Sequence, residues 1–204
     1  MKMIKDIGTM LTAFLVTLSM TPGAFAATDT AIVQMDISSS LALDCGATVT
    51  MGDITGYGFS SLSTNVLNCN VITNSSSGYT MSIKSDTETT MQDAATDTIA
   101  AIAVTPAAWN VADSASGWGM RLSDASTDDN TTTWGVDDCT LVDYGTTCKW
   151  AGTALTDLQL IDTTTETIPA GSDQKIMFGA EVDDTKTQPT GDYHNDITIT
   201  AVAS

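Results

Sequence analysis

The stretch that decides the fold is the C-terminal one, Gln188–Ser204, which reads QPTGDYHNDITITAVAS. It opens with the turn sequence Pro189-Thr190-Gly191 and then alternates without interruption. Every second residue from Tyr193 to Ala201 falls on one face, and the residues between them, beginning with His194, fall on the other. Period-two alternation with many β-branched residues indicates a strand with one buried and one solvated face.

A second alternating run, Gln174–Val182, lies just upstream. Lys175 and Glu181 are predicted to face solvent, and the residues predicted to face inward are Ile176, Phe178, Ala180 and Val182. Joined through residues 183–191, the two runs predict an antiparallel hairpin that closes a β-sandwich. The sequence contains no long run of apolar residues at helical spacing, so the predicted fold class is all-β.

Shorter runs predict the other strands. They are residues 31–37, 41–51, 65–73, 79–83, 117–123 and 155–161. The turn sequence Asn74–Gly78 predicts a hairpin between the third and fourth of these runs. Residues 99–104 fit either a short strand or one helical turn.

The N-terminus has the composition of an export signal. Two lysines precede an apolar run over residues 10–20, and the small-residue stretch Pro22–Ala26 follows. This order defines a secretory signal peptide, whereas a membrane span needs about 20 apolar residues. We therefore predict a signal peptide over residues 1–26 and a secreted protein, extracellular or at the cell surface, with no membrane span after cleavage.

The chain after the signal peptide is strongly acidic. The whole sequence has a formal net charge of −18, and because residues 1–26 carry +1, the remainder carries −19. Nucleic acids and anionic lipids are bound by clustered Lys and Arg. A nucleic-acid partner is therefore excluded, and the acidic surface fits an extracellular protein.

Four cysteines in an exported chain predict two disulfides, which allow three connectivities. The favoured pairing joins sequence neighbours, Cys45 with Cys69 and Cys139 with Cys148. Neither pair has Cys-x-x-Cys spacing and the chain has one histidine, so a zinc site or redox motif has little support. The cysteines are interpreted as structural staples.

The sequence offers no catalytic constellation. His194 lies on the outward face of the last strand with Asp196, but no nucleophile motif such as G-x-S-x-G is present. Pairs of carboxylates arise by chance in so acidic a chain, and they give no evidence for glycoside hydrolysis. We expect a protein that is not an enzyme, with a surface position for His194.

One loop-rich region is a candidate for calcium or carbohydrate binding. Calcium takes about six to eight oxygen ligands, and the candidate ligands are Asp128, Asp129, Asn130, Asp137 and Asp138. They flank Trp134, the best candidate for an exposed aromatic platform, whereas Trp118 is predicted to be a core residue. The spacing does not match an EF-hand, and a solvated acidic loop is the alternative. Weak calcium binding is the only cofactor expectation.

Together, these features resemble bacterial surface-fibre subunits of the spore coat protein U and fimbrial (pilin) kind. The resemblance is carried by a signal peptide, a strand with Cys45, a strand with Cys69, and the closing stretch from Gly191 to Thr200. It implies an incomplete immunoglobulin-like antiparallel sandwich of Greek-key type over residues 41–204. A strand from a neighbouring subunit's N-terminal extension would complete it. Unlike chaperone-delivered pilins, this chain has no aromatic residue near its C-terminus.

The candidate donor strand is the extension 27–40, whose alternating apolar residues are Val33, Met35 and Ile37. Strand addition to an exposed sheet edge would bind it to the next subunit. The alternative is that it forms the first strand of its own sandwich.

The resemblance implies a non-enzymatic structural protein, a subunit of a cell-surface fibre, pilus or coat. Its expected partners are further copies of the chain or related fibre subunits, with a periplasmic chaperone as a candidate helper. The alternative function is a secreted adhesive module that binds carbohydrate or calcium.

Overall fold

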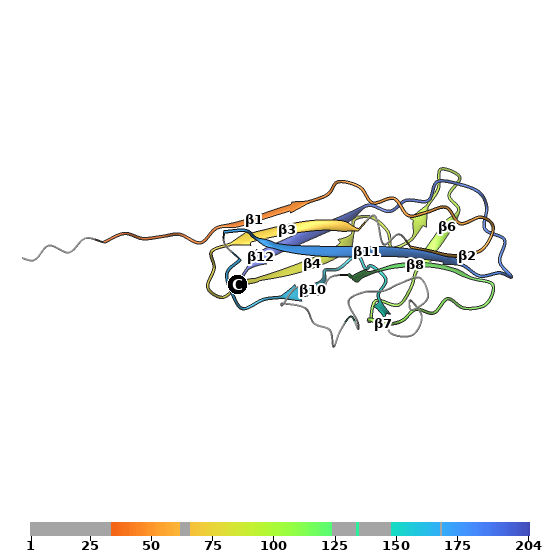
Figure 1. The fold of residues 1–204 in the computed structure, drawn as a ribbon. Coiled ribbons are helices and arrows are strands. Elements are labelled where there is room, and N and C mark those ends of the chain that lie inside the picture. The colour runs from red at the N-terminus through yellow and green to blue at the C-terminus, as the bar shows by residue number, and fades with distance from the viewer. Residues whose placement is uncertain (1–33, 62–65, 124–133, 135–147, 168) are drawn as a thin grey trace, which may run out of the picture. The chain divides into compact units, whose positions relative to one another are not determined.

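The structure, a computed structural model, describes residues 34–61, 66–123, 134, 148–167 and 169–204. The chain divides after Ile37, and Ser38–Ser204 form one compact unit. The named elements of the described part are β-strands in sheets that pack against each other (Figure 1), which confirms the all-β prediction. The predicted signal peptide lies outside the described residues.

The larger sheet is built around one long strand, β11. The sheet order is β1-β3-β11-β8-β6-β5, and β2 also pairs with β11. The strands are β1 (Leu41–Cys45), β2 (Gly58–Ser61), β3 (Leu67–Thr73), β5 (Met91–Gln92), β6 (Thr98–Ala101), β8 (Ser116–Leu122) and β11 (Ser172–Val182). β11 pairs with β3 and then β2 along one edge and with β8 along the other. Its pairs are antiparallel, whereas β6 and β8 run parallel.

The smaller sheet has β4 at its centre. Its order is β10-β4-β12, with β4 (Tyr79–Ser85), β10 (Leu158–Asp162) and β12 (Ile197–Ala203). Both pairs are antiparallel. The short strands β7 (Ala107–Ala108) and β9 (Lys149–Trp150) form a separate pair.

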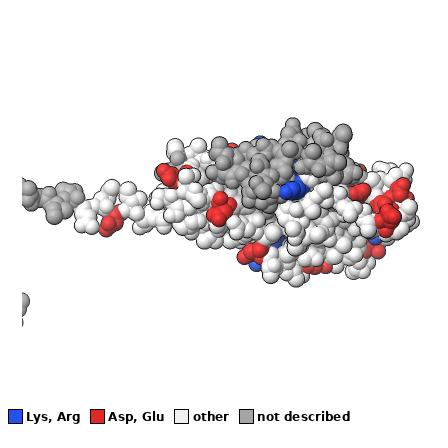
Figure 2. Space-filling view, turned by 90° about the horizontal axis from the view of Figure 1, so that it is seen from below, with Lys and Arg blue, Asp and Glu red and all other residues white. Residues whose placement is uncertain are grey.

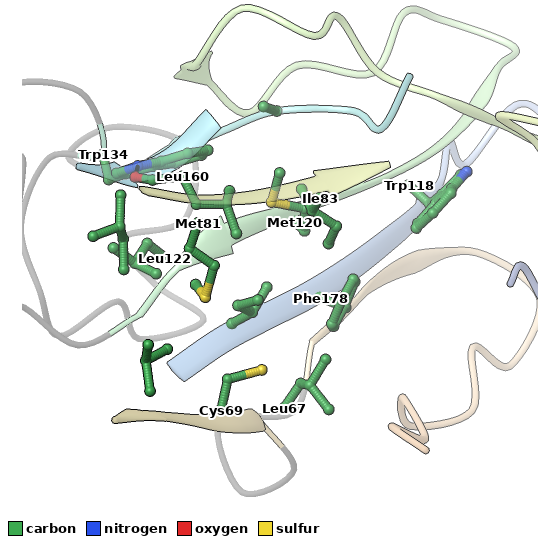
Figure 3. Packing of buried hydrophobic residues seen from close by; sticks show 14 of the residues in the cluster. Leu67, Cys69, Met81, Ile83, Trp118, Met120, Leu122, Trp134, Leu160 and Phe178 are labelled. Carbon is green, nitrogen blue, oxygen red and sulfur yellow. Dashed lines mark hydrogen bonds between the residues drawn. The ribbon is translucent and has the colours of Figure 1, made fainter. Parts of the chain in front are cut away.

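The main core lies between the larger and the smaller sheet (Figure 3). Because alternate side chains point to opposite faces of a strand, β3 and β4 each bury every second residue. Side chains from both sheets meet in this core, among them Cys69, Met120 and Phe178 from the larger sheet and Met81, Ile83 and Leu160 from the smaller. Trp118 is also buried here, as predicted, and its indole N–H donates to the carbonyl oxygen of Thr89 at 2.9 Å.

Both predicted hairpins are wrong for the same reason. β11 and β12 belong to different sheets, and so do β3 and β4. The connection crosses the sandwich in each case, so that the apolar faces of the two runs meet across the core. At the β3–β4 corner, Gly78 adopts a φ of +80° and its N–H donates to the carbonyl oxygen of Ser75 at 3.0 Å. A local turn sequence marks a change of direction, but it does not decide which sheet the next strand joins.

The inward face of β11 is as predicted, but its other face is also partly buried. Met177 packs with Trp109, Cys148 and Trp150 in a second cluster. The sequence of β11 does not reveal this cover, because it comes from a distant part of the chain. The last strand also starts later than predicted, at Ile197.

Candidate functional site

The candidate donor segment belongs to no strand where the structure describes it. Residues 34–40 have no regular secondary structure, and the first strand begins at Leu41. Met35 is 78% exposed and Ile37 is 77% exposed. Exposed apolar side chains of this size, two residues apart, are suited to an interaction with another surface. The third candidate, Val33, lies outside the described residues.

β1 is the edge strand of the larger sheet and pairs with β3 alone among the named strands. Leu41 and Leu43 are half-buried against the main core, whereas Ala42 and Asp44 are exposed. An edge strand presents backbone N–H and C=O groups that can pair with a further strand. β1 therefore has both a backbone edge and an incompletely covered apolar face.

β12 is the corresponding edge of the smaller sheet and pairs with β4 alone in the defined topology. Ile197, Ile199 and Ala201 pack on the main core, yet each remains partly exposed. On the opposite face of the strand, Val202 is 56% exposed. The alternating run therefore has the predicted orientation, but its inner face is incompletely covered.

β1 and β12 lie next to each other at one side of the sandwich. Their half-buried inner residues form what we call the open margin, which consists of Leu41, Leu43, Ile197, Ile199 and Ala201. In a sandwich, such inward-facing side chains are normally covered by the facing sheet. The open margin is thus a place where an added strand would bury apolar surface and extend a sheet edge.

The Cys45–Cys69 disulfide fastens β1 to β3 and confirms the predicted pairing. The two residues face each other directly in the register of the two strands. Cys148 is buried and disulfide-bonded. Its predicted partner, Cys139, lies outside the described residues, and that pairing stays a prediction.

The predicted calcium and carbohydrate loop keeps only one described residue, Trp134. Its side chain is 1% exposed and its indole N–H donates to the carbonyl oxygen of Leu160 at 3.4 Å. The interpretation of Trp134 as an exposed platform is therefore wrong, because it fills the main core beside the smaller sheet (Figure 3). The candidate ligands Asp128, Asp129, Asn130, Asp137 and Asp138 lie outside the described residues. Elsewhere in the described chain, no group of three potential ligand side chains could hold a metal.

Trp109 and Trp150 form a structural pair rather than a binding platform. Their rings meet edge to face with centroids 5.1 Å apart, and their side chains are 6% and 1% exposed. The indole N–H of Trp109 donates to the carboxylate of Glu181 on β11. Aromatic side chains with a satisfied N–H and little exposure stabilise the fold.

Polar residues around β12 also have structural roles. His194 is exposed, as predicted, and its backbone exchanges hydrogen bonds with Gln92, both at 2.9 Å. On the connection before β12, Asp183 accepts hydrogen bonds from the hydroxyl and N–H of Thr185 and from the N–H of Ser114. These bonds lower the pKa of Asp183 below its ordinary value, with the Thr185 hydroxyl as the largest cause.

Figure 2 shows one face of the molecule, on which acidic side chains are spread widely and basic ones are isolated. Among the described residues seen on this face, the Lys and Arg side chains form no cluster suited to a polyanion. Among the residues that the structure describes, no helix is long and apolar enough to cross a membrane.

Comparison with protein-family models and with curated proteins finds no match for this chain.

Proposed function

We propose that this chain is an exported, non-enzymatic structural subunit that assembles through its strand edges into a cell-surface fibre, pilus or coat. In this proposal the sandwich is immunoglobulin-like, has Greek-key topology and lacks one strand. The observation that carries the proposal is the open margin between β1 and β12, together with the exposure of Met35 and Ile37 in the same chain.

The two features are chemically complementary. Val33, Met35 and Ile37 recur with the period of a strand, so all three would point to one side when the segment is extended. Burying each such side chain contributes about 1.5–3 kcal/mol. The backbone of the added strand would at the same time pair with an edge of β1 or β12.

The partner in this proposal is another copy of the chain or a related fibre subunit. A periplasmic chaperone would cover the open margin before assembly, because exposed apolar edges favour aggregation. The carbohydrate-binding alternative loses its aromatic platform, since Trp134 is buried. Weak calcium binding by the acidic loop stays a separate prediction.

The test compares the chain from residue 27 with a chain from which residues 27–40 are deleted. We expect the longer protein to form polymers in size analysis with light scattering, and the deleted one to be a monomer of lower melting temperature. A synthetic peptide of residues 27–40 should restore the melting temperature of the deleted protein.

The matched control is the same peptide with aspartate in place of Val33, Met35 and Ile37. It keeps the backbone groups but loses the apolar anchors, so we expect no stabilisation. If both proteins are equally stable monomers and neither peptide binds, strand donation is refuted. Glycan and calcium binding would then be measured next.

A further inference from the structure

The chain just before β1 is held in place by two side chains at the end of β3. Asn74 Oδ1 accepts a hydrogen bond from the N–H of Ser40 at 2.7 Å, and Asn74 Nδ2 donates to the carbonyl oxygen of Ser38 at 3.1 Å. Thr73 Oγ1 donates to the carbonyl oxygen of Ser40 at 2.9 Å. We call these three hydrogen bonds the Asn74 clamp.

The clamp imitates a strand partner. A carboxamide carries the same donor and acceptor groups as a peptide unit, and Asn74 uses both on one side of residues 38–40. The β1–β3 ladder begins at the Leu41–Thr73 pair, so the clamp continues it in the N-terminal direction. Thr73, one of the two residues that form the clamp, is itself held in place, because it is 0% exposed and its N–H donates to Thr167 Oγ1 at 2.8 Å.

Residues 38–40 are also where the chain would have to turn back to pair the donor segment with its own β1. A tight hairpin uses two residues in a type I′ or II′ turn, which needs positive φ. Among the described non-glycine residues, positive φ occurs at Thr96 and Ser114 and not at residues 38–40. A turn placed further upstream would include Ile37 or Met35, so that this residue could no longer lie in the paired strand.

We propose that the Asn74 clamp prevents residues 27–37 from folding back onto β1 of the same chain and so commits them to a second copy. This inference rests on the proposed function, since it assigns a direction to the donor segment. The clamp acts by holding residues 38–40 in a conformation that is incompatible with a hairpin. Asn74 is in this sense a positioning residue for assembly.

The test replaces Asn74 with alanine in the chain from residue 27. The control is Asn70→Ala, because Asn70 lies on β3 itself and its Nδ2 donates a hydrogen bond to Asp173 Oδ1 at 2.6 Å. After refolding at high dilution, we expect Asn74→Ala to raise the monomer-to-polymer ratio on the order of tenfold, since two hydrogen bonds oppose the hairpin. The control should leave the ratio unchanged.

Hydrogen exchange distinguishes a self-paired monomer from a merely destabilised one. In the Asn74→Ala monomer, the amides of residues 33–37 should be protected and the melting temperature should not fall. A second variant, Ser38→Asn with Ser39→Gly, keeps Asn74 and installs a hairpin turn sequence. It should give the same protected monomer.

Three results would overturn the inference. One is an unchanged monomer-to-polymer ratio in both variants, another is unprotected amides at residues 33–37 in their monomers, and the third is protection of those amides in a wild-type monomer. Failure of the proposed function is seen separately. It appears as a wild-type chain that has the same size as the chain lacking residues 27–40.

Discussion

Replacing both Met35 and Ile37 with aspartate should abolish polymers without affecting the folded subunit. The two side chains are 78% and 77% exposed in their own chain, so aspartate at either position removes little packing there. The melting temperature of the double-variant monomer should therefore equal that of the wild-type monomer. Any effect on assembly would come from contacts with another molecule.

The expected loss of association between subunits follows from the apolar surface that Met35 and Ile37 expose. Burying each side chain in a neighbouring subunit would contribute about 1.5–3 kcal/mol, or about 3–6 kcal/mol for the pair. Because about 1.4 kcal/mol changes an equilibrium constant tenfold, the association constant at each junction should fall by about 100- to 10,000-fold. Placing a carboxylate in the open margin would weaken association further.

The assay is light scattering coupled to size analysis over a dilution series, with thermal unfolding of the monomer in parallel. The matched control is Thr30→Asp with Gln34→Asp, which adds the same two charges at the alternate positions of the segment. It should assemble nearly as well as wild type. Polymers of unchanged size in the double aspartate variant, or equal losses in variant and control, would refute the assignment of Met35 and Ile37 as anchors.

Three further predictions concern the subunit itself. Positive φ alone makes alanine cost about 1–2 kcal/mol of the free energy of unfolding. Gly78→Ala should cost more than this, because the new Cβ would lie 2.3 Å from a backbone carbonyl oxygen. Gly56→Ala, with φ +86° and no atom within 4 Å of the new Cβ, should cost only the amount due to φ, and urea unfolding measures both variants. Replacing Cys45 and Cys69 with serine should lower the free energy of unfolding by about 2–4 kcal/mol in the same assay. Asp183→Asn should remove a pH-dependent part of stability: the folded pKa of Asp183 lies below its ordinary 3.8, so its stabilisation is present above that value and is lost as the pH falls through the folded pKa.

Each of these predictions has a contrary result. Equal losses for Gly78→Ala and Gly56→Ala would mean that the corner relaxes to accept a methyl group. An unchanged urea midpoint without the disulfide would mean that the β1–β3 ladder alone holds the edge. A difference between wild type and Asp183→Asn that persists undiminished in strong acid would mean that the carboxylate charge is not what stabilises the connection.

The strands with strong alternation could be predicted from the sequence, but the assignment of strands to sheets could not. β11 has its predicted inner face because Ile176, Phe178 and Ala180 recur with period two and pack on the main core. The β3–β4 hairpin is wrong because hairpins and corners share the same turn residues. The parallel pairing of β6 with β8 also has no local signal, since it depends on contacts between distant segments.

The candidate site can also be predicted only in part from the sequence. The alternation of Met35 and Ile37 predicts a strand, but residues 34–40 have no regular secondary structure. Alternation also does not show whether the same chain covers these side chains. The pairing of Cys45 with Cys69 was predictable as a pairing of sequence neighbours and is confirmed. The prediction for Trp134 is wrong because its acidic neighbours in sequence indicate solvent, whereas its indole N–H donates to a carbonyl oxygen of β10. The Asn74 clamp had no sequence signal beyond a turn-forming asparagine.

The Cys45–Cys69 disulfide has a mechanical consequence. A pull on the chain N-terminal to β1 would reach Ser38–Ser40 first and then peel β1 from β3, beginning at the Leu41–Thr73 pair. Peeling can release no more than Leu41–Asp44, because Cys45 is covalently bound to a strand that lies inside the larger sheet. At about 3.3 Å per residue, the subunit would lengthen slightly under tension and then stiffen abruptly.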